Sequence, residues 1–313
     1  MGSGTWSAST YDSFTGSRIS SGTTFDYDRT VRATGIYKPA DELDPSKLNS
    51  AGLNIRESRD SDEHPLSTPI IVQFDSTGSM GSVPRVVQTK LKTLFQLLLD
   101  KKYCTDPQVA IATYGDATCD RVPLQFGQFE SDNRIDEELD KLFLEGGGGG
   151  NDGETSQLGL YYAAYHTSTD SWEKRNKKGY FFLIADEKQI AITAQHIKDV
   201  IGDAQPLGDI TEAGIATAVS KTWQVHVLLV KNYAAVSQHS EEFYTKLFGP
   251  DAITIVQDPD AIAETIAAII GFEEGRDLAV ITDDLREAAG KEVATRVEAS
   301  LAKRNPAESA RLR

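Results

Sequence analysis

Residues 70–82 read IIVQFDSTGSMGS. The first five residues are mostly apolar and form a short run that is typical of a buried parallel strand. The run ends at Asp75, and the hydroxyls of Thr77 and Ser79 follow at spacings of two residues, before an amphipathic helical pattern begins. A buried strand that ends in oxygen-bearing side chains just ahead of a helix is typical of a ligand-binding loop in an α/β protein.

Strand-like and helix-like segments alternate along the central part of the chain, outward from this stretch. We expect strands at residues 70–74, 108–116, 179–187, 223–231 and 252–257, an edge strand at 122–129, and helices at 84–100, 134–144, 155–167, 190–203, 210–222, 240–249 and 258–272. Such alternation predicts an α/β fold with a doubly wound, mostly parallel, Rossmann-like sheet and helices on both faces.

The two ends of the chain differ from this central domain, which we assign to residues 69–275. Residues 1–68 are rich in Ser, Thr, Gly, Asp and Tyr, and we expect an irregular N-terminal arm in which residues 24–37 could form a short strand or hairpin. Recurring aromatic residues favour an arm that docks on another surface. Residues 276–313 are expected to form one or two helices, broken near Gly290, and a tail, lying on the domain or on a partner.

Composition restricts the class of protein. The 313 residues carry a formal net charge of −15, which argues against binding to nucleic acid or to an anionic membrane surface. We expect no transmembrane helix and no secretory signal, because the chain lacks a long apolar run and a basic start. Cys104 and Cys119 are too few for a disulfide framework, although a pairing between them stays open. A cytoplasmic location is therefore expected.

Polar clusters fall at three of the expected strand ends: residues 75–79, residues 145–156 and Asp186. In the first cluster, Gly78 permits a turn that brings the hydroxyls of Thr77 and Ser79 round to the side of the preceding carboxylate. A carboxylate with neutral hydroxyls forms a set of hard oxygen ligands, which suits Mg2+, Mn2+ or Ca2+ better than zinc or copper. The sequence therefore predicts a metal site with one position open for an outside carboxylate.

This arrangement resembles the metal-ion-dependent adhesion site (MIDAS) of von Willebrand factor A (vWA) domains, over about residues 68–272. The resemblance implies that Asp75, Thr77 and Ser79 match the D-x-S/T-x-S motif and that Asp186 matches the aspartate of the third loop. The second loop departs from the commonest form of the family and is similar to the variant loop of some bacterial and kinase-associated members.

The residue that the second loop contributes stays open at this point. Thr155 is our choice of metal ligand, and the alternatives are Asp152, Glu154 and Ser156. Asp116, which follows the second strand, could add a contact behind the ligands. The five metal ligands that we predict are therefore Asp75, Thr77, Ser79, Thr155 and Asp186.

The resemblance also implies a function. An intracellular bacterial or phage-type member of the family would bind a partner protein without catalysis, with a Glu or Asp of the partner completing the coordination of the metal. The partner could be an AAA+ ATPase or a kinase. The alternative is a structural subunit of a larger assembly, in which the N-terminal arm and the C-terminal helices mediate oligomerisation.

Other chemistries fit the residues less well. The glycine run at residues 146–150 lacks the lysine of a phosphate-binding loop, and neighbouring acids would repel phosphate. Aspartyl-phosphate chemistry needs a second carboxylate where Thr77 stands. A hydrolase using metal-activated water would need a general base, for which Glu187 is the nearby candidate. A hydroxyl-rich turn in which Asp75 merely caps the following helix is the structural alternative.

Overall fold

The computed structural model describes residues 4–21, 25–49, 52–147, 153–231 and 237–302. A six-stranded sheet of order β4-β3-β2-β6-β7-β8 forms its centre. The strands are β2 (Thr68–Asp75), β3 (Pro107–Tyr114), β4 (Leu124–Phe126), β6 (Gly179–Ala185), β7 (Trp223–Val230) and β8 (Ile253–Val256). All neighbours are parallel except β4, which runs antiparallel to β3 at one edge.

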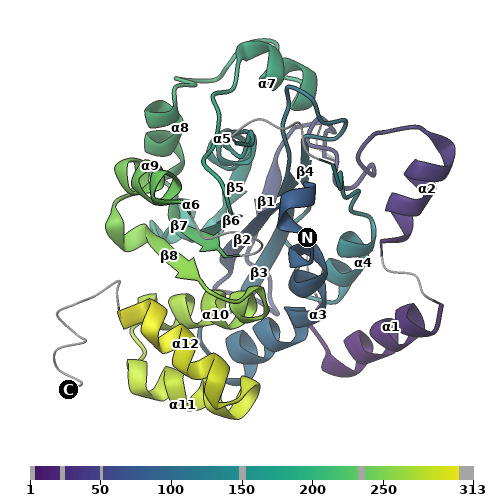
Figure 1. Cartoon of the computed structure of the whole chain (residues 1–313). Coiled ribbons are helices and arrows are strands. Elements are labelled where there is room, and N and C mark those ends of the chain that lie inside the picture. The colour runs from purple at the N-terminus through teal and green to yellow at the C-terminus, as the bar shows by residue number, and fades with distance from the viewer. Residues whose placement is uncertain (1–3, 22–24, 50–51, 148–152, 232–236, 303–313) are drawn as a thin grey trace.

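Helices cover both faces of this sheet, because its strands bury side chains in both directions. In β2, Ile70, Val72 and Phe74 belong to one hydrophobic core and Ile71 to the other. Helices α3 (Val83–Phe95), α4 (Arg134–Asp140) and α10 (Ile262–Glu273) contribute to the first core, and α5 (Gln157–Tyr165), α7 (Ala194–Val200), α8 (Glu212–Val219) and α9 (Gln238–Phe248) to the second (Figure 1). The predicted doubly wound α/β fold, with helices on both faces, is confirmed.

Several of the expected elements are shorter than their hydrophobic patterns. The helix expected at 84–100 ends as an α-helix at Phe95 and continues as a π-helical turn, Gln96–Asp100. The short helix α6 (Asp170–Arg175) lies between two expected elements.

A second, two-stranded parallel sheet pairs β1 (Arg56–Ser58) with β5 (Thr167–Thr169), which ties the N-terminal segment to the central domain.

The N-terminal segment contains helices that the sequence did not predict. Residues Ala8–Ser21 form α1 and Asp26–Thr34 form α2, so the strand or hairpin expected within residues 24–37 is wrong. Two aspartates in the first turn of α2 suit the positive end of the helix dipole. Gly35, at φ +69°, ends the helix in the left-handed conformation that glycine adopts without strain.

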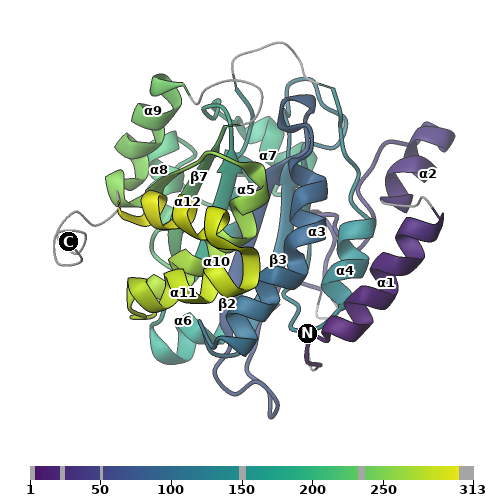
Figure 2. The ribbon, with the colours of Figure 1, turned by 60° about the horizontal axis from the view of Figure 1, so that its bottom comes forward.

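This segment docks on the central domain, as its aromatic residues suggested. Trp6, which is 8% exposed, stacks on Phe95 of α3 with ring centroids 5.3 Å apart. The hydroxyl of Tyr11 donates to the backbone carbonyl of Gln88, also on α3, at 3.0 Å. Figure 2 shows α1 and α2 together beside α3 and α4. The arm therefore belongs to the packed core of the molecule.

The C-terminal segment forms α11 (Leu278–Ala289) and α12 (Lys291–Ala302), which meet at Gly290, as expected. Ile281, Leu285 and Val297 are buried in the same hydrophobic core as α10, so these helices complete the core over one face of the sheet. None of the helices in the described ranges combines the length and apolarity needed to span a lipid bilayer. Cys104 and Cys119 are both free thiols.

Candidate metal site

The predicted site lies at the point where the chain reverses its direction of travel across the sheet. From β2 the chain proceeds outward to β3 and β4, and it then returns to β6 on the other side of β2. Asp75 is the last residue of β2, and Asp186 directly follows β6. These two strands are neighbours, with Phe74 aligned to Ile184. Ligands of doubly wound proteins bind at such a crevice, outside the carboxyl ends of the strands.

The first loop folds its polar groups toward this crevice. The backbone N–H of Thr77 donates to Oδ1 of Asp75 at 2.6 Å, and residues Gly78–Met80 form a single 3-10 turn. The turn brings the hydroxyl oxygens of Thr77 and Ser79 to 3.2 Å from each other. The Ser79 hydroxyl in turn hydrogen-bonds to the Asp186 carboxyl. Four of the five predicted ligands are thus linked in one cluster.

Both aspartates carry a buried oxygen that lacks a protein partner. Within the described chain, Oδ2 of Asp75 and Oδ1 of Asp186 have no hydrogen-bond donor. Asp75 is 1% exposed, and burial raises its pKa to about 7, although hydrogen bonds from Thr77 act in the opposite direction. Burial likewise raises the pKa of Asp186. Unpaired buried carboxylate oxygens are costly, and a divalent cation between them would remove that cost.

The glycine run begins directly beside this loop. The N–H of Gly78 donates to the carbonyl of Gly147 at 2.8 Å, and the N–H of Gly146 donates to the carbonyl of Ser76 at 3.3 Å. A Cβ at Gly78 would lie only 3.2 Å from the carbonyl oxygen of Gly146. This agrees with the interpretation that the glycines let the backbone pass close to the site.

Thr155, our choice in the second loop, uses its hydroxyl to join two loops. The hydroxyl donates to the carbonyl of Gly115 at 2.7 Å and accepts the N–H of Ala117 at 2.9 Å. Both partners belong to the loop that follows β3. Thr155 is therefore held mainly by neighbours that are not part of the metal cluster. One lone pair of its hydroxyl oxygen is left for a cation.

Glu154, one of the alternatives, is placed more favourably. Its Oε2 is buried and, among the described residues, has no hydrogen-bond partner. Burial and then the nearby charge of Asp75 raise the pKa of Glu154 to about 9. Ser156, another alternative, hydrogen-bonds through its hydroxyl to Gln189 at 3.3 Å. Asp152 lies outside the described residues.

Asp116 and Asp120 both lie in the loop that follows β3. The carboxylate of Asp116 accepts the N–H and the hydroxyl of Thr118 at 2.8 and 2.7 Å, so it organises its own loop. Sequence reasoning missed Asp120, whose charge contributes to the raised pKa values of both Asp75 and Glu154. The only signal for it was its position in the polar loop after the second strand.

Acidic side chains alone do not complete a metal site here. In the ranges that the structure covers, no three Asp, Glu, His or Cys side chains are grouped tightly enough to hold a metal ion. A cation at this crevice would therefore have to use hydroxyl oxygens as well, and Thr77 and Ser79 are placed to supply them. An all-oxygen set of this kind fits a hard cation.

Comparison with known proteins identifies similar structures only. No family model and no curated protein sequence matches the chain. The chain is similar to the pilus adhesin SpaC of Lactobacillus rhamnosus GG in its open conformation, at 13% identity and a TM-score of 0.45, over 73% of this chain and 31% of that chain. It thus spans about a third of the length of the adhesin.

Two further solved structures are similar at comparable levels. Proximal thread matrix protein 1 from the mussel byssus, with a zinc-occupied MIDAS motif, is 11% identical with a TM-score of 0.44, over 66% of this chain and 46% of that chain. An aerotolerance-related membrane protein of Bacteroides fragilis NCTC 9343 is 14% identical with a TM-score of 0.39, over 66% of this chain and 99% of that chain. A function for the chain therefore has to be inferred from its own residues.

Proposed function

We propose that the chain is a vWA-like module that binds a partner protein through a divalent cation held at a MIDAS. The observation that carries the proposal is a pair of buried carboxylate oxygens, Oδ2 of Asp75 and Oδ1 of Asp186, that have no hydrogen-bond partner among the described residues. They stand at the carboxyl ends of neighbouring parallel strands, and the hydroxyls of Thr77 and Ser79 lie beside them. A hard cation is the ligand that such an oxygen cluster fits best.

The residues near the proposed metal fall into those that would bind it and one that holds the loops together. Asp75, Thr77, Ser79 and Asp186 form the cluster described above. Glu154 is the better candidate from the second loop, because its Oε2 lacks a partner within the described chain, and it would reach the metal through a water, since no three acidic side chains of the described ranges are grouped tightly enough to bind one ion directly. Thr155 then mainly links the second loop to the loop after β3 through hydrogen bonds. We propose Mg2+, with Mn2+ or Ca2+ as alternatives, and the bound cation would supply a Lewis-acidic centre for an incoming carboxylate.

The charges around the crevice indicate how a partner would be selected. Asp120, Asp116 and Glu187 add negative charge to the same edge, because their charges contribute to the raised pKa of Glu154. Without the cation, this edge would repel an acidic side chain. We therefore propose that a partner Glu or Asp binds only in the presence of metal and that basic residues flank it. An AAA+ ATPase or a kinase is the class of partner that we propose.

We propose that the module is not an enzyme and acts in the cytoplasm. Thr77 stands where aspartyl-phosphate chemistry would need its second carboxylate. The other candidate function, a structural subunit that oligomerises through its N-terminal arm, is less favoured, because Trp6, Tyr11 and Phe25 are buried against the chain's own core. These aromatic residues are therefore not displayed for a second molecule.

Metal-dependent capture of partners tests this proposal. Immobilised wild-type protein and the Asp75→Asn variant would be exposed to a cell extract in Mg2+ or in EDTA, with Asp283→Asn as a control, since the side chain of Asp283 is 74% exposed on α11. We expect a partner that the wild type and the control retain in Mg2+ and lose in EDTA, and that Asp75→Asn never retains. Retention of the same proteins under all conditions would contradict the proposal.

A further inference from the structure

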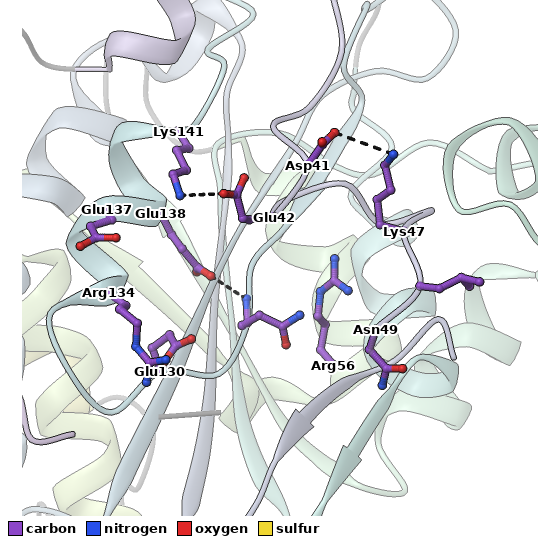
Figure 3. Close-up of a pocket in the computed structure, with 12 residues that line it drawn as sticks. Asp41, Glu42, Lys47, Asn49, Arg56, Glu130, Arg134, Glu137, Glu138 and Lys141 are labelled. Atoms are coloured by element: carbon purple, nitrogen blue, oxygen red, sulfur yellow. Dashed lines mark hydrogen bonds and ion pairs between the residues drawn. The ribbon is translucent and has the colours of Figure 1, made fainter. Parts of the chain in front are cut away.

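A second, charged cavity of about 320 Å3 lies away from the metal site. Its walls come from the segment before β1, from Arg56 of β1, from the loop after β4 and from α4 (Figure 3). Glu130, in that loop, pairs with Val109 near the beginning of β3. The cavity is therefore nearer to the amino ends of the strands, whereas the metal site occupies their carboxyl ends.

Most of the charges around this cavity compensate one another. Lys141 of α4 pairs with Glu42 at 2.9 Å, and Arg134 pairs with Glu130 at 2.9 Å. Lys47 lies 3.8 Å from Asp41. Two of these pairs, Lys141 with Glu42 and Lys47 with Asp41, are marked in Figure 3. Two further buried residues line the cavity, one acidic and one basic.

The acidic residue is Glu138 of α4, which is only 6% exposed. Its Oε1 accepts the backbone N–H of Gln128 at 3.0 Å. Its Oε2 is buried without a hydrogen-bond partner among the described residues, and the charges of Arg56 and Lys141 act on the carboxyl electrostatically. Burial raises the pKa of this carboxyl to about 8.

The cationic residue is Arg56 of β1, which is 2% exposed. Its guanidinium donates to two neutral acceptors, the carbonyl of Phe126 at 3.3 Å and the carbonyl of Asp44 at 2.9 Å. It also lies over the ring of Tyr162, 5.9 Å from the centroid. In the described part of the chain, no carboxylate pairs with it, although its charge lowers the pKa of Glu138. The guanidinium can thus still accept an anionic partner.

We propose that this cavity binds a small zwitterion, a molecule that carries an ammonium group and a carboxylate, such as a free amino acid. The ammonium would lie against Glu138 and the carboxylate against Arg56. Burial keeps most of Glu138 protonated at neutral pH, and a bound ammonium would stabilise its ionised form. The carboxylate of the same molecule would pair with the buried guanidinium of Arg56. A cavity of about 320 Å3 is at the small end of ligand pockets, which suits a molecule of this size.

Ligands of a single charge fit the two residues less well. A simple anion would satisfy Arg56 and leave Glu138 without a partner, and a simple amine would do the reverse. The charged rim does not favour either, because it holds paired residues of both signs, Lys141 with Glu42 and Lys47 with Asp41. The buried carboxyl and the buried guanidinium therefore favour a molecule that carries both an ammonium group and a carboxylate.

Titration calorimetry and thermal shift would test this site in EDTA, so that the metal site plays no part. The probes are glycine, β-alanine, γ-aminobutyrate and L-leucine, with propylamine and propionate as ligands of one charge. We expect at least one zwitterion to bind saturably at millimolar concentration and to raise Tm, and both single-charge probes to bind at least about tenfold more weakly. The ω-amino acid that binds best would report the separation of the two charges.

Two variants and a control complete the test. Glu138→Gln keeps the shape of the side chain and is expected to weaken binding of the zwitterion by at least about tenfold, and Arg56→Lys keeps the charge but loses the fork geometry and should also weaken it. Glu292→Gln, on the exposed side of α12, should bind like the wild type. The proposal is overturned if no zwitterion binds, if propionate or propylamine binds as tightly, or if folded Glu138→Gln binds with unchanged affinity.

Discussion

The backbone N–H of Gly78 donates to the carbonyl of Gly147 at 2.8 Å. This bond joins the loop of the proposed metal site to the beginning of the glycine run. The N-terminal arm holds the segment just before this run, because Asp28 of α2 accepts the N–H of Leu144 at 3.1 Å. Arg32, also on α2, donates to the carbonyl of Leu144. The N-terminal arm thus holds a loop that contacts the metal site.

Replacing Arg32 by alanine should therefore weaken metal binding without unfolding the protein. A charged hydrogen bond contributes about 1.5 kcal/mol or more, and we expect part of this to appear as a loss of metal affinity of about fivefold. Arg29→Ala is the matched control, because Arg29 lies on the same helix and its ion pair is with Asp26 of that helix. Calorimetric titration with Mn2+ would measure both variants. Equal affinities for wild type and Arg32→Ala would contradict the coupling.

The two candidates in the second loop should differ in what their loss affects. Glu154→Gln is expected to lower metal affinity by about tenfold or more. It should leave the stability of the metal-free protein nearly unchanged, since burial already keeps this carboxyl protonated at neutral pH and its Oε2 has no partner in the described chain. Thr155→Val should instead destabilise the fold by about 1–3 kcal/mol, because it leaves the carbonyl of Gly115 and the N–H of Ala117 without their partner.

Metal titration together with urea unfolding of these two variants separates the roles. If Thr155→Val loses metal affinity while Glu154→Gln retains it, the assignment in the second loop reverses and Thr155 is the ligand, as the sequence first suggested.

Glu138 should make the stability of the ligand-free protein depend on pH. Burial raises its pKa from 4.5 to about 8 in the folded state, so between these pH values the folded state binds more protons than the unfolded state. Stability should therefore fall as pH rises through this window, by at most about 1.4 kcal/mol per pH unit. Glu138→Gln should remove this contribution. Urea unfolding from pH 5 to about 8 would measure it, and parallel curves for wild type and variant would contradict it.

The docking of the N-terminal arm predicts a large effect of Trp6. Trp6→Ala should destabilise the protein by about 3 kcal/mol, because the indole stacks on Phe95 in the core. Ile36→Ala is the control in the same segment, since Ile36 is 63% exposed. Denaturant unfolding would compare them. A Trp6→Ala variant as stable as the Ile36→Ala variant would show that the arm does not dock in solution.

The strands of the sheet could be predicted from the sequence because each is buried on both faces. Such strands read as nearly continuous apolar runs, as in β6, where all residues from Gly179 to Ala185 are buried. Helix α2 could not be predicted in this way. Its short sequence is mostly polar, and contacts distant in sequence hold it in place, such as that of Arg32 with Leu144.

Some residues of the candidate site could likewise be predicted from the sequence, and others could not. Asp75 and Asp186 could be predicted, since Asp75 ends one apolar strand, Asp186 directly follows another, and parallel strands end at one edge. The relative merits of Glu154 and Thr155 depend on which side chain turns toward the crevice, which adjacent positions in a sequence do not reveal. The contribution of Asp120 depends on the path of the loop after β3, where its Oδ2 accepts the N–H of Asp116 at 2.6 Å.

The central claim is that Asp75 and its neighbours hold a divalent cation, and calorimetric titration with Mg2+ and Mn2+ tests it most directly. Wild-type protein would be compared with Asp75→Asn, and Asp283→Asn would serve as the exposed control. We predict saturable binding of one ion per chain for the wild type and the control, and no binding for Asp75→Asn. Absence of binding to the wild type, or the same affinity in Asp75→Asn, would contradict the claim.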